Sequence, residues 1–180
     1  MSFNFKKQLI TPLFLIFTIN LLGQISQGGE PFSFSHQLKS EPNPHIVKAP
    51  TINEINNASN SGKGPYCIGI LKSTHISSNT DGIWTTNSDG SKVWRVKIQS
   101  KGAIGLTLHY KHFYIPDGGE IFLYNRNKNH VIGKFTSNRN QLNKITHTQI
   151  IQGDQTYIEY YQPASNTEKL KIEIEKVGYI

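Results

Sequence analysis

The chain carries histidines, aspartates and serines, the side chains of acid–base and nucleophilic catalysis, but no spacing that assembles them. A trypsin-like centre needs a serine in a glycine-flanked turn, a histidine base and a buried aspartate. Neither Gly-Asp-Ser-Gly nor Gly-x-Ser-x-Gly occurs in the sequence. The seven histidines fall on expected loops and outward strand positions: His36, His45, His75, His109, His112, His130 and His147. We therefore expect no catalytic residue in this chain and no enzymatic activity from it.

The spacing of the metal-ligating residue types does not favour a metal centre either. His109 and His112 are three residues apart, and an odd spacing on a strand directs two side chains to opposite faces. The carboxylates stand at expected turns, where they accept hydrogen bonds from nearby backbone, and none follows an EF-hand spacing. Calcium bound through such turns is the less favoured alternative. The sequence predicts no cofactor and no resident metal.

The densest basic stretch, residues 124–144, favours binding to a partner over chemistry. Basic residues interleaved with aromatic ones can hold nucleic acid. For an exported domain, a solvated loop or an acidic partner explains the same pattern better, and we expect no nucleic-acid binding. The candidate binding residues in this stretch are Tyr124, Arg126, Lys128, Lys134 and Arg139.

Trp84 is the sixth candidate binding residue. Aromatic side chains at alternating strand positions are explained by core packing, whereas Trp84 lies in a turn-rich segment. An indole ring left exposed there offers a flat apolar plate on which a sugar ring can stack. We therefore retain a glycan or a cell surface as an alternative partner that would bind at Trp84.

Two neighbouring segments with a strict period of two must form the centre of the fold. In Val93–Gln99, Trp94, Val96 and Ile98 alternate with polar residues, and Ala103–Tyr110 shows the same alternation. A period of two indicates half-buried strands, because successive strand side chains point to opposite faces. A short connection that contains Gly102 predicts that the two strands pair as an antiparallel hairpin.

The rest of the chain after residue 64 repeats this pattern between turn signals. We expect a second hairpin around Gly153, with residues 149–151 pairing with residues 156–161. About eight strands with regular turns are typical of an all-β antiparallel β-sandwich of the jelly-roll type. The expected strands cover residues 67–72, 93–99, 103–110, 120–124, 131–135, 149–151, 156–161 and 170–175, and residues 83–84 lie in or beside a further one. The sandwich domain is predicted to span residues 65–180.

The first residues indicate export. Lys6 and Lys7 precede an apolar stretch that is too short to span a bilayer comfortably, so residues 1–23 are predicted to be a signal peptide. Its removal lowers the count of Lys and Arg from 19 to 17 against 12 acids, a net charge of about +5. The expected location is extracellular or periplasmic, with no membrane span after signal removal. Cys67 is the only cysteine, so no intramolecular disulfide can form.

Residues 24–64 form a separate segment rich in Pro and Asn. Its prolines argue against a long helix or a central strand. We predict an extended arm with one helical turn near Ile52 to Ala58, ending in a glycine-containing linker at residues 60–64.

A series of short phrases gives the chain a family resemblance. In order, they are Gln27-Gly28-Gly29-Glu30-Pro31, Gly82-Ile83-Trp84, Val93 to Ile98, Ser100-Lys101-Gly102-Ala103, Leu106-Thr107-Leu108, Phe113 to Gly118, Ile121 to Tyr124, Gly133 to Thr136, Ile151 to Asp154, and Val177-Gly178-Tyr179. Together they resemble the non-catalytic N-terminal region of secreted bacterial trypsin-like serine proteases of the lysyl endopeptidase type. In that family a catalytic domain with a His, Asp and Ser triad follows this region. The sequence stops at Ile180, where the family would continue into catalysis, so no catalytic residue is carried over.

The resemblance implies a propeptide-like or accessory module. Such a module would assist folding, maintain latency or present the protease by protein–protein contact, with the catalytic domain as its partner in cis or in trans. Two alternatives remain open at this point. One is a free-standing carbohydrate- or surface-binding module, and the other is a truncated remnant of a protease gene.

Overall fold

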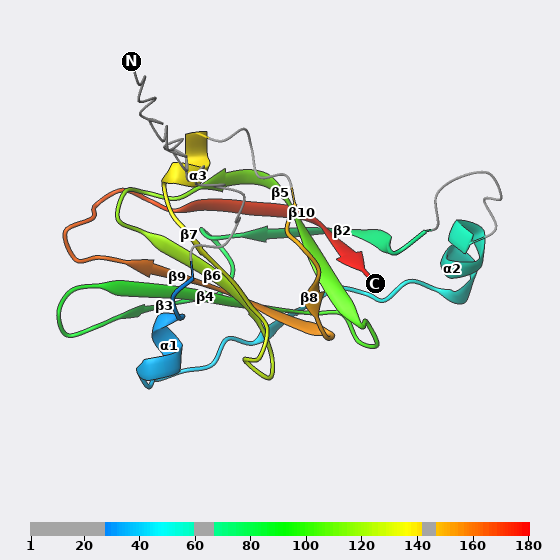
Figure 1. The fold of residues 1–180 in the computed structure, drawn as a ribbon, viewed down its shortest axis with the longest axis horizontal. Coiled ribbons are helices and arrows are strands. Elements are labelled where there is room, and N and C mark those ends of the chain that lie inside the picture. Colours follow the sequence, from blue (N-terminus) through cyan, green and yellow to red (C-terminus); the bar gives the residue numbers. More distant parts are fainter. Residues whose placement is uncertain (1–27, 60–66, 142–146) are drawn as a thin grey trace, which may run out of the picture.

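A computed structural model describes residues 28–59, 67–141 and 147–180. The predicted signal peptide, residues 1–23, lies outside the described residues. Two sheets face each other around one hydrophobic core (Figure 1). The first, sheet A, follows the order β1-β4-β9-β6-β7, and β3 also pairs with β4. Its strands are β1 (Pro44–Ile46), β3 (Ile83–Thr86), β4 (Lys92–Gln99), β6 (Glu120–Asn125), β7 (Val131–Phe135) and β9 (Gln155–Gln162).

The second sheet, sheet B, follows the order β2-β10-β5-β8. Its strands are β2 (Ile70–Ser77), β5 (Gly105–Tyr114), β8 (Ile151–Gln152) and β10 (Lys171–Tyr179). All strand pairs are antiparallel except β1 with β4, which is parallel. The predicted all-β sandwich is therefore confirmed. The described residues form ten strands where about eight were expected, and β1 lies in the arm, where no strand was predicted.

Three short helices accompany the sheets: α1 (Phe32–Ser35), α2 (Ile52–Ser59) and α3 (Asn138–Gln141). The predicted helical turn near Ile52 is α2. Thr51 Oγ1 accepts a hydrogen bond from Glu54 N at 3.3 Å, and the Glu54 carboxylate accepts one from Thr51 N at 2.7 Å, which makes a capping box. Hydrogen bonds from Lys72 and then from Thr51 lower the pKa of Glu54 to about 2. None of the helices in the described part of the chain is long and apolar enough to cross a membrane.

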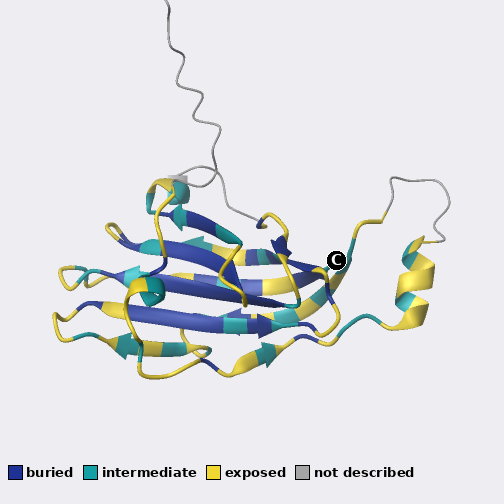
Figure 2. Ribbon diagram, turned by 60° about the horizontal axis from the view of Figure 1, so that its bottom comes forward, coloured by how far each residue is buried: buried dark blue, intermediate teal, exposed yellow. Residues whose placement is uncertain are grey.

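The core lies between the sheets and takes most of the apolar residues that the period of two placed inward. Ile104, which the same alternation placed inward, is instead 77% exposed, because it precedes β5 at the crossing between the sheets. Trp94, Val96 and Ile98 point inward from β4, and Leu106 and Leu108 point inward from β5. The buried strands run through the middle of the molecule, whereas the exposed residues gather on α2 and the loops (Figure 2). Full burial of each such side chain stabilises the fold by roughly 1.5–3 kcal/mol.

The predicted pairing of the two central strands is wrong. β4 belongs to sheet A and β5 to sheet B, so the turn at Ser100 to Ala103 crosses from one sheet to the other. The second predicted hairpin is wrong for the same reason, since β8 pairs with β5 and β9 pairs with β4. The two crossings bond to each other: Ser100 N donates to Asp154 O at 3.0 Å, and Gly153 N donates to Ile104 O at 2.8 Å. A period of two reports that one face of a strand is buried, which holds for strands of either sheet.

Residues 28–47 of the arm pack along sheet A, whereas α2 lies beside β2 of sheet B, where Lys72 Nζ lies 2.6 Å from Glu54. β1 begins at Pro44 and pairs with one end of β4, while β3 pairs with the other end of the same strand edge. Val47 is buried in the core, and Ile46 remains largely exposed. Pro44 is compatible with this position because β1 is an edge strand and proline lacks only the backbone donor. In Figure 1, α1 lies on the side of sheet A that faces away from sheet B.

Candidate binding site at Trp84

Trp84 is held on the edge strand β3, where it pairs in register with Trp94 of β4. Its indole ring meets Tyr160 edge-on, with ring centroids 6.0 Å apart, and Trp94 at a tilt, with centroids 6.5 Å apart. Its Nε1 lies 3.4 Å from Ser78 O and donates a hydrogen bond to it. The residue nevertheless stays 44% exposed. The ring is therefore fixed along one side and open to solvent on the rest.

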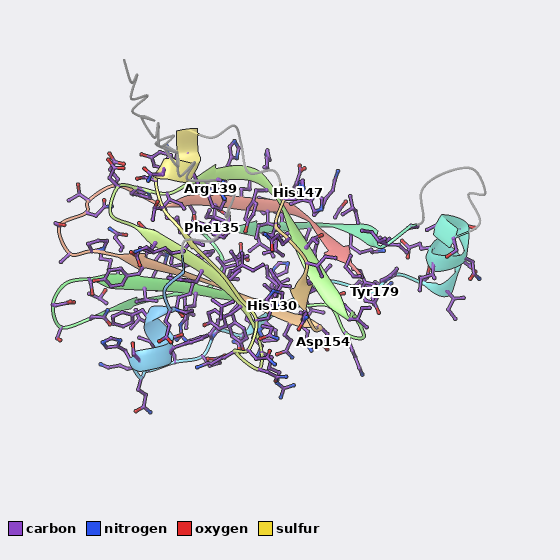
Figure 3. All side chains as sticks on the ribbon, in the orientation of Figure 1. His130, Phe135, Arg139, His147, Asp154 and Tyr179 are labelled. Carbon is purple, nitrogen blue, oxygen red and sulfur yellow. The ribbon has the colours of Figure 1, made fainter. Side chains whose placement is uncertain are left out.

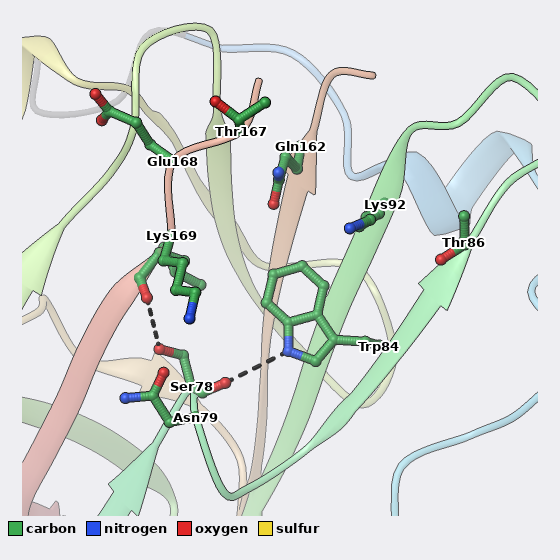
Figure 4. Close-up of a pocket in the computed structure, with 10 residues that line it drawn as sticks. Ser78, Asn79, Trp84, Thr86, Lys92, Gln162, Thr167, Glu168 and Lys169 are labelled. Atoms are coloured by element: carbon green, nitrogen blue, oxygen red, sulfur yellow. Dashed lines mark hydrogen bonds between the residues drawn. The ribbon is translucent and has the colours of Figure 1, made fainter. Parts of the chain in front are cut away.

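The open part of the ring borders a cleft of about 400 Å³. Its lining comes from the β2–β3 connection, from β3 and β4, from the end of β9, and from the loop before β10 (Figure 4). Most of the lining side chains are polar or charged. They are Ser78, Asn79, Thr86, Lys92, Gln162, Thr167, Glu168 and Lys169, with Leu170 completing the wall.

Hydrogen bonds keep the walls of this cleft in place. Ser78 Oγ donates to Leu170 O and accepts from Ile172 N, both at 3.1 Å, which ties the β2–β3 connection to the start of β10. Glu168 accepts a hydrogen bond from Tyr114 Oη at 2.7 Å, and this bond raises the pKa of Tyr114. Gln162 Nε2 donates to Asn166 O at 2.7 Å.

The cleft presents side-chain groups that can bind a ligand. It offers an indole face, two lysines, one carboxylate and several amide and hydroxyl groups. An apolar plate with polar groups around it suits a ring that carries hydroxyls. Among the described residues, no group of three or more His, Cys, Asp or Glu side chains could hold a metal ion.

Three other candidate residues meet beside the arm, in a second cleft of about 300 Å³. Arg126 and Lys128 are exposed in the β6–β7 loop, and Lys128 Nζ lies 4.8 Å from the centroid of the Phe34 ring. Tyr124 is buried: its Oη donates to Glu159 at 3.0 Å and lies 3.2 Å from Ser33 Oγ. Burial, and next the charge of Glu159, raise the pKa of Tyr124 above its usual value. These residues contact the arm.

The last two candidates stand apart from both clefts. Lys134 on β7 pairs with Glu120 on β6 at 2.7 Å, within sheet A. The Arg139 guanidinium lies 5.8 Å from the centroid of the Phe135 ring, and Figure 3 shows the two residues near the same end of the sandwich, on α3 and β7. The structure thus brings Tyr124, Arg126 and Lys128 together, and places Trp84, Lys134 and Arg139 at separate points.

Sequence reasoning missed two groups of residues. The polar neighbours of Trp84, such as Gln162 and Glu168, come from strands and loops distant in sequence, so no local spacing could indicate them. It also missed the buried charges Arg95 and Glu159, which stand opposite each other on β4 and β9 and are 5% and 1% exposed. The signal for these was a charged residue at an outward position on each of two strands rich in apolar residues.

Comparisons with known proteins do not assign the chain to a family. No protein-family model matches the chain, and no solved structure matches the fold.

Proposed function

We propose that the chain is the exported, non-catalytic pro- or accessory domain of a bacterial serine protease of the lysyl endopeptidase type. It acts by contact with the catalytic domain, in cis or in trans, and assists folding, latency or presentation. The observation that carries the proposal is the ordered series of phrases. Val93 to Ile98, Leu106 to Leu108 and Ile121 to Tyr124 supply β4, β5 and β6, and Ile151 to Asp154 supplies a crossing between the sheets. The residues that carry the resemblance therefore fall in the framework of the domain.

The proposal is tested by adding the purified full chain to a separately produced lysyl-endopeptidase-type catalytic domain during refolding. The expected result is a higher yield of active protease, or inhibition of the folded protease, in proportion to the added chain. Heat-unfolded chain is the control, because it has the same composition without the two sheets. If neither the yield nor the activity changes, the proposal is wrong.

A second function, glycan binding, is favoured by the Trp84 cleft. The specific observation is an indole ring 44% exposed above a cleft whose lining is mostly polar. We expect saturable binding of the native chain to a member of a neutral and acidic glycan panel, followed by calorimetry on that glycan. Trp84→Ala should abolish this binding, while Ile46→Ala, which changes an exposed side chain on β1, should leave it unchanged. Absence of binding across the panel would exclude this second function.

A further inference from the structure

The outer face of sheet B has an apolar end created by three glycines. Leu71, Gly178 and Thr107 stand in one register row across β2, β10 and β5. A Cβ atom at Gly178 would lie 3.5 Å from Leu71 Cδ2, and one at Gly105 would lie 2.5 Å from Ile150 Cγ2. A Cβ atom at Gly69 would lie 2.5 Å from Ile180 Cδ1. The side chains of Leu71, Ile150 and Ile180 therefore lie beside the glycines on the outer face of sheet B, and the Thr107 hydroxyl lies nearest to Gly178.

The result is a cluster of exposed aliphatic side chains, which we call the sheet B patch. It consists of Leu71, Ile150 and Ile180, which lie beside Gly178, Gly105 and Gly69. Leu71 is 52% exposed, and Ile150 is 41% exposed. Exposed aliphatic groups that gather in one place, rather than singly, mark interaction surfaces.

The next outward row of sheet B contains Lys176 and two imidazole rings. Lys176 of β10 stands opposite His109 of β5, and the His109 and His147 rings stack with centroids 5.6 Å apart. Figure 3 shows His147 beside β5 and β10, whereas Tyr179 packs against the core from the other face of β10. Further along the face the charges compensate each other, since Glu173 lies within 4 Å of Lys111, His112 and His75. The row at Lys176 therefore places positive charge beside the patch, with Glu175 as the nearby acid.

We propose that the sheet B patch docks a folded protein whose contact surface is apolar at its centre and acidic on the side that meets Lys176. The proposal rests on the proposed function and names the surface through which it acts. Aliphatic side chains with a charged flank match the anatomy of protein interfaces, with an apolar centre and a polar rim. A sugar ring would need an aromatic plate, which the patch lacks and Trp84 provides.

Charge also distinguishes a different protein from a second copy of this chain. A symmetric dimer through the patch would place the same surface on both sides of the contact. A second copy would therefore bring its own Lys176 to the contact, and like charges oppose association. An acidic surface on a different protein would instead attract Lys176.

The test measures the affinity of the native chain for a separately produced lysyl-endopeptidase-type catalytic domain by calorimetry. The double substitution Leu71→Gln/Ile150→Gln should weaken binding at least tenfold. Ile46→Gln is the matched control, since Ile46 is 64% exposed but lies on β1 of sheet A. Lys176→Glu should weaken binding several-fold in dilute buffer, and the loss should shrink as salt is added. Equal melting temperatures of the variants by circular dichroism show that they fold.

Each of the other possible results of these experiments contradicts one part of the proposal. If the native chain does not bind the catalytic domain, the proposed function fails and the docking proposal fails with it. If the native chain binds and the double variant binds equally well, the docking proposal alone is wrong. If Lys176→Glu does not change the affinity, the partner surface that meets Lys176 is not acidic, and that part of the proposal is wrong. Sedimentation that shows a native dimer and a monomeric double variant would assign the patch to self-association and overturn the proposal.

Discussion

The two outer faces of the sandwich differ in what covers them. On sheet A the arm lies against the strands, and the face beneath it contains Arg95, Glu159 and Tyr124, all nearly fully buried. On sheet B no described segment covers the patch, and its aliphatic side chains meet solvent. The difference shows that a polar face can become interior when the chain supplies its own cover, and that an apolar face can remain exposed when it does not.

Specific contacts fix the arm over sheet A. Glu159 accepts hydrogen bonds from Ser33 N at 2.8 Å and from Tyr124 Oη at 3.0 Å. Arg95 donates to Ser40 O and lies 3.5 Å from the Glu41 carboxylate. A buried charge is tolerated only when hydrogen bonds or an opposite charge replace water. The arm provides those partners, so the arm and the two charges depend on each other.

The largest expected effect on stability therefore comes from Glu159. Glu159→Ala removes the acceptor for Ser33 N and Tyr124 Oη and leaves Arg95 without the charge opposite it in register. Because breaking a buried charged network typically costs about 3–5 kcal/mol, we expect a loss of about 3 kcal/mol in the free energy of unfolding. Urea denaturation measures the free energy of unfolding. Glu175→Ala, at an exposed position on β10, is the control and should stay within about 0.5 kcal/mol of the native protein. Equal losses for the two variants would contradict the contrast between the faces.

The next effect concerns the arm itself. The Phe32 ring stacks on Tyr161, with centroids 5.4 Å apart, and on His36, with centroids 3.9 Å apart. Phe32→Ala should cost about 1 kcal/mol, since the ring is only half-buried, and should speed cleavage of the arm by a nonspecific protease. Mass spectrometry of the fragments locates the cuts. Gln37→Ala, at an exposed arm position, should leave the cleavage rate as it is. An unchanged rate for Phe32→Ala would mean that the ring does not hold the arm.

A substitution on the outer face of sheet B should change binding rather than the free energy of unfolding. Leu71→Gln changes a side chain that is already 52% exposed, so its free energy of unfolding should stay within about 0.5 kcal/mol of the native value. Its effect should instead appear in binding to the catalytic domain, as argued above. A loss of stability comparable to that of Phe32→Ala, without any change in affinity, would make the patch a part of the packing rather than a docking surface.

The same contrast explains how far the sequence could predict the fold. Alternation in β4 placed Trp94, Val96 and Ile98 inward, and the structure confirms it. Alternation placed Arg95 on the opposite face, which is also correct, but it carries no information on what lies over that face. The pairing of β4 with β9 instead of β5 depends on how the chain turns at Ser100 and Asp154, where two corners from distant segments bond to each other. Such long-range contacts leave no local periodicity.

The candidate site follows the same rule. The turn-rich surroundings of Trp84 correctly indicated an exposed indole, since Trp84 is 44% exposed on the edge strand β3. Glu168 and Gln162 reach the cleft only because β9 ends and β10 begins beside it. Tyr124 was proposed for binding from its basic neighbours, but its position on β6 buries it beneath the arm. Local sequence therefore predicts what a residue type favours, whereas the packing of distant strands decides what it contacts.

The smallest expected effect is a pH dependence that belongs to sheet B. Burial, then the neighbouring His147 and Lys176, lower the pKa of His109, and Glu175 opposes them. Because the folded state then holds the proton less tightly than the unfolded state, stability should decline as the pH falls below the ordinary histidine pKa of about 6.5. His109→Gln should lessen this decline between about pH 7.5 and pH 5.5 in urea denaturation, whereas Lys111→Gln, at an exposed position on the same strand, should leave it unchanged. An identical decline with and without His109 would show that the open face of sheet B does not couple to folding in this pH range.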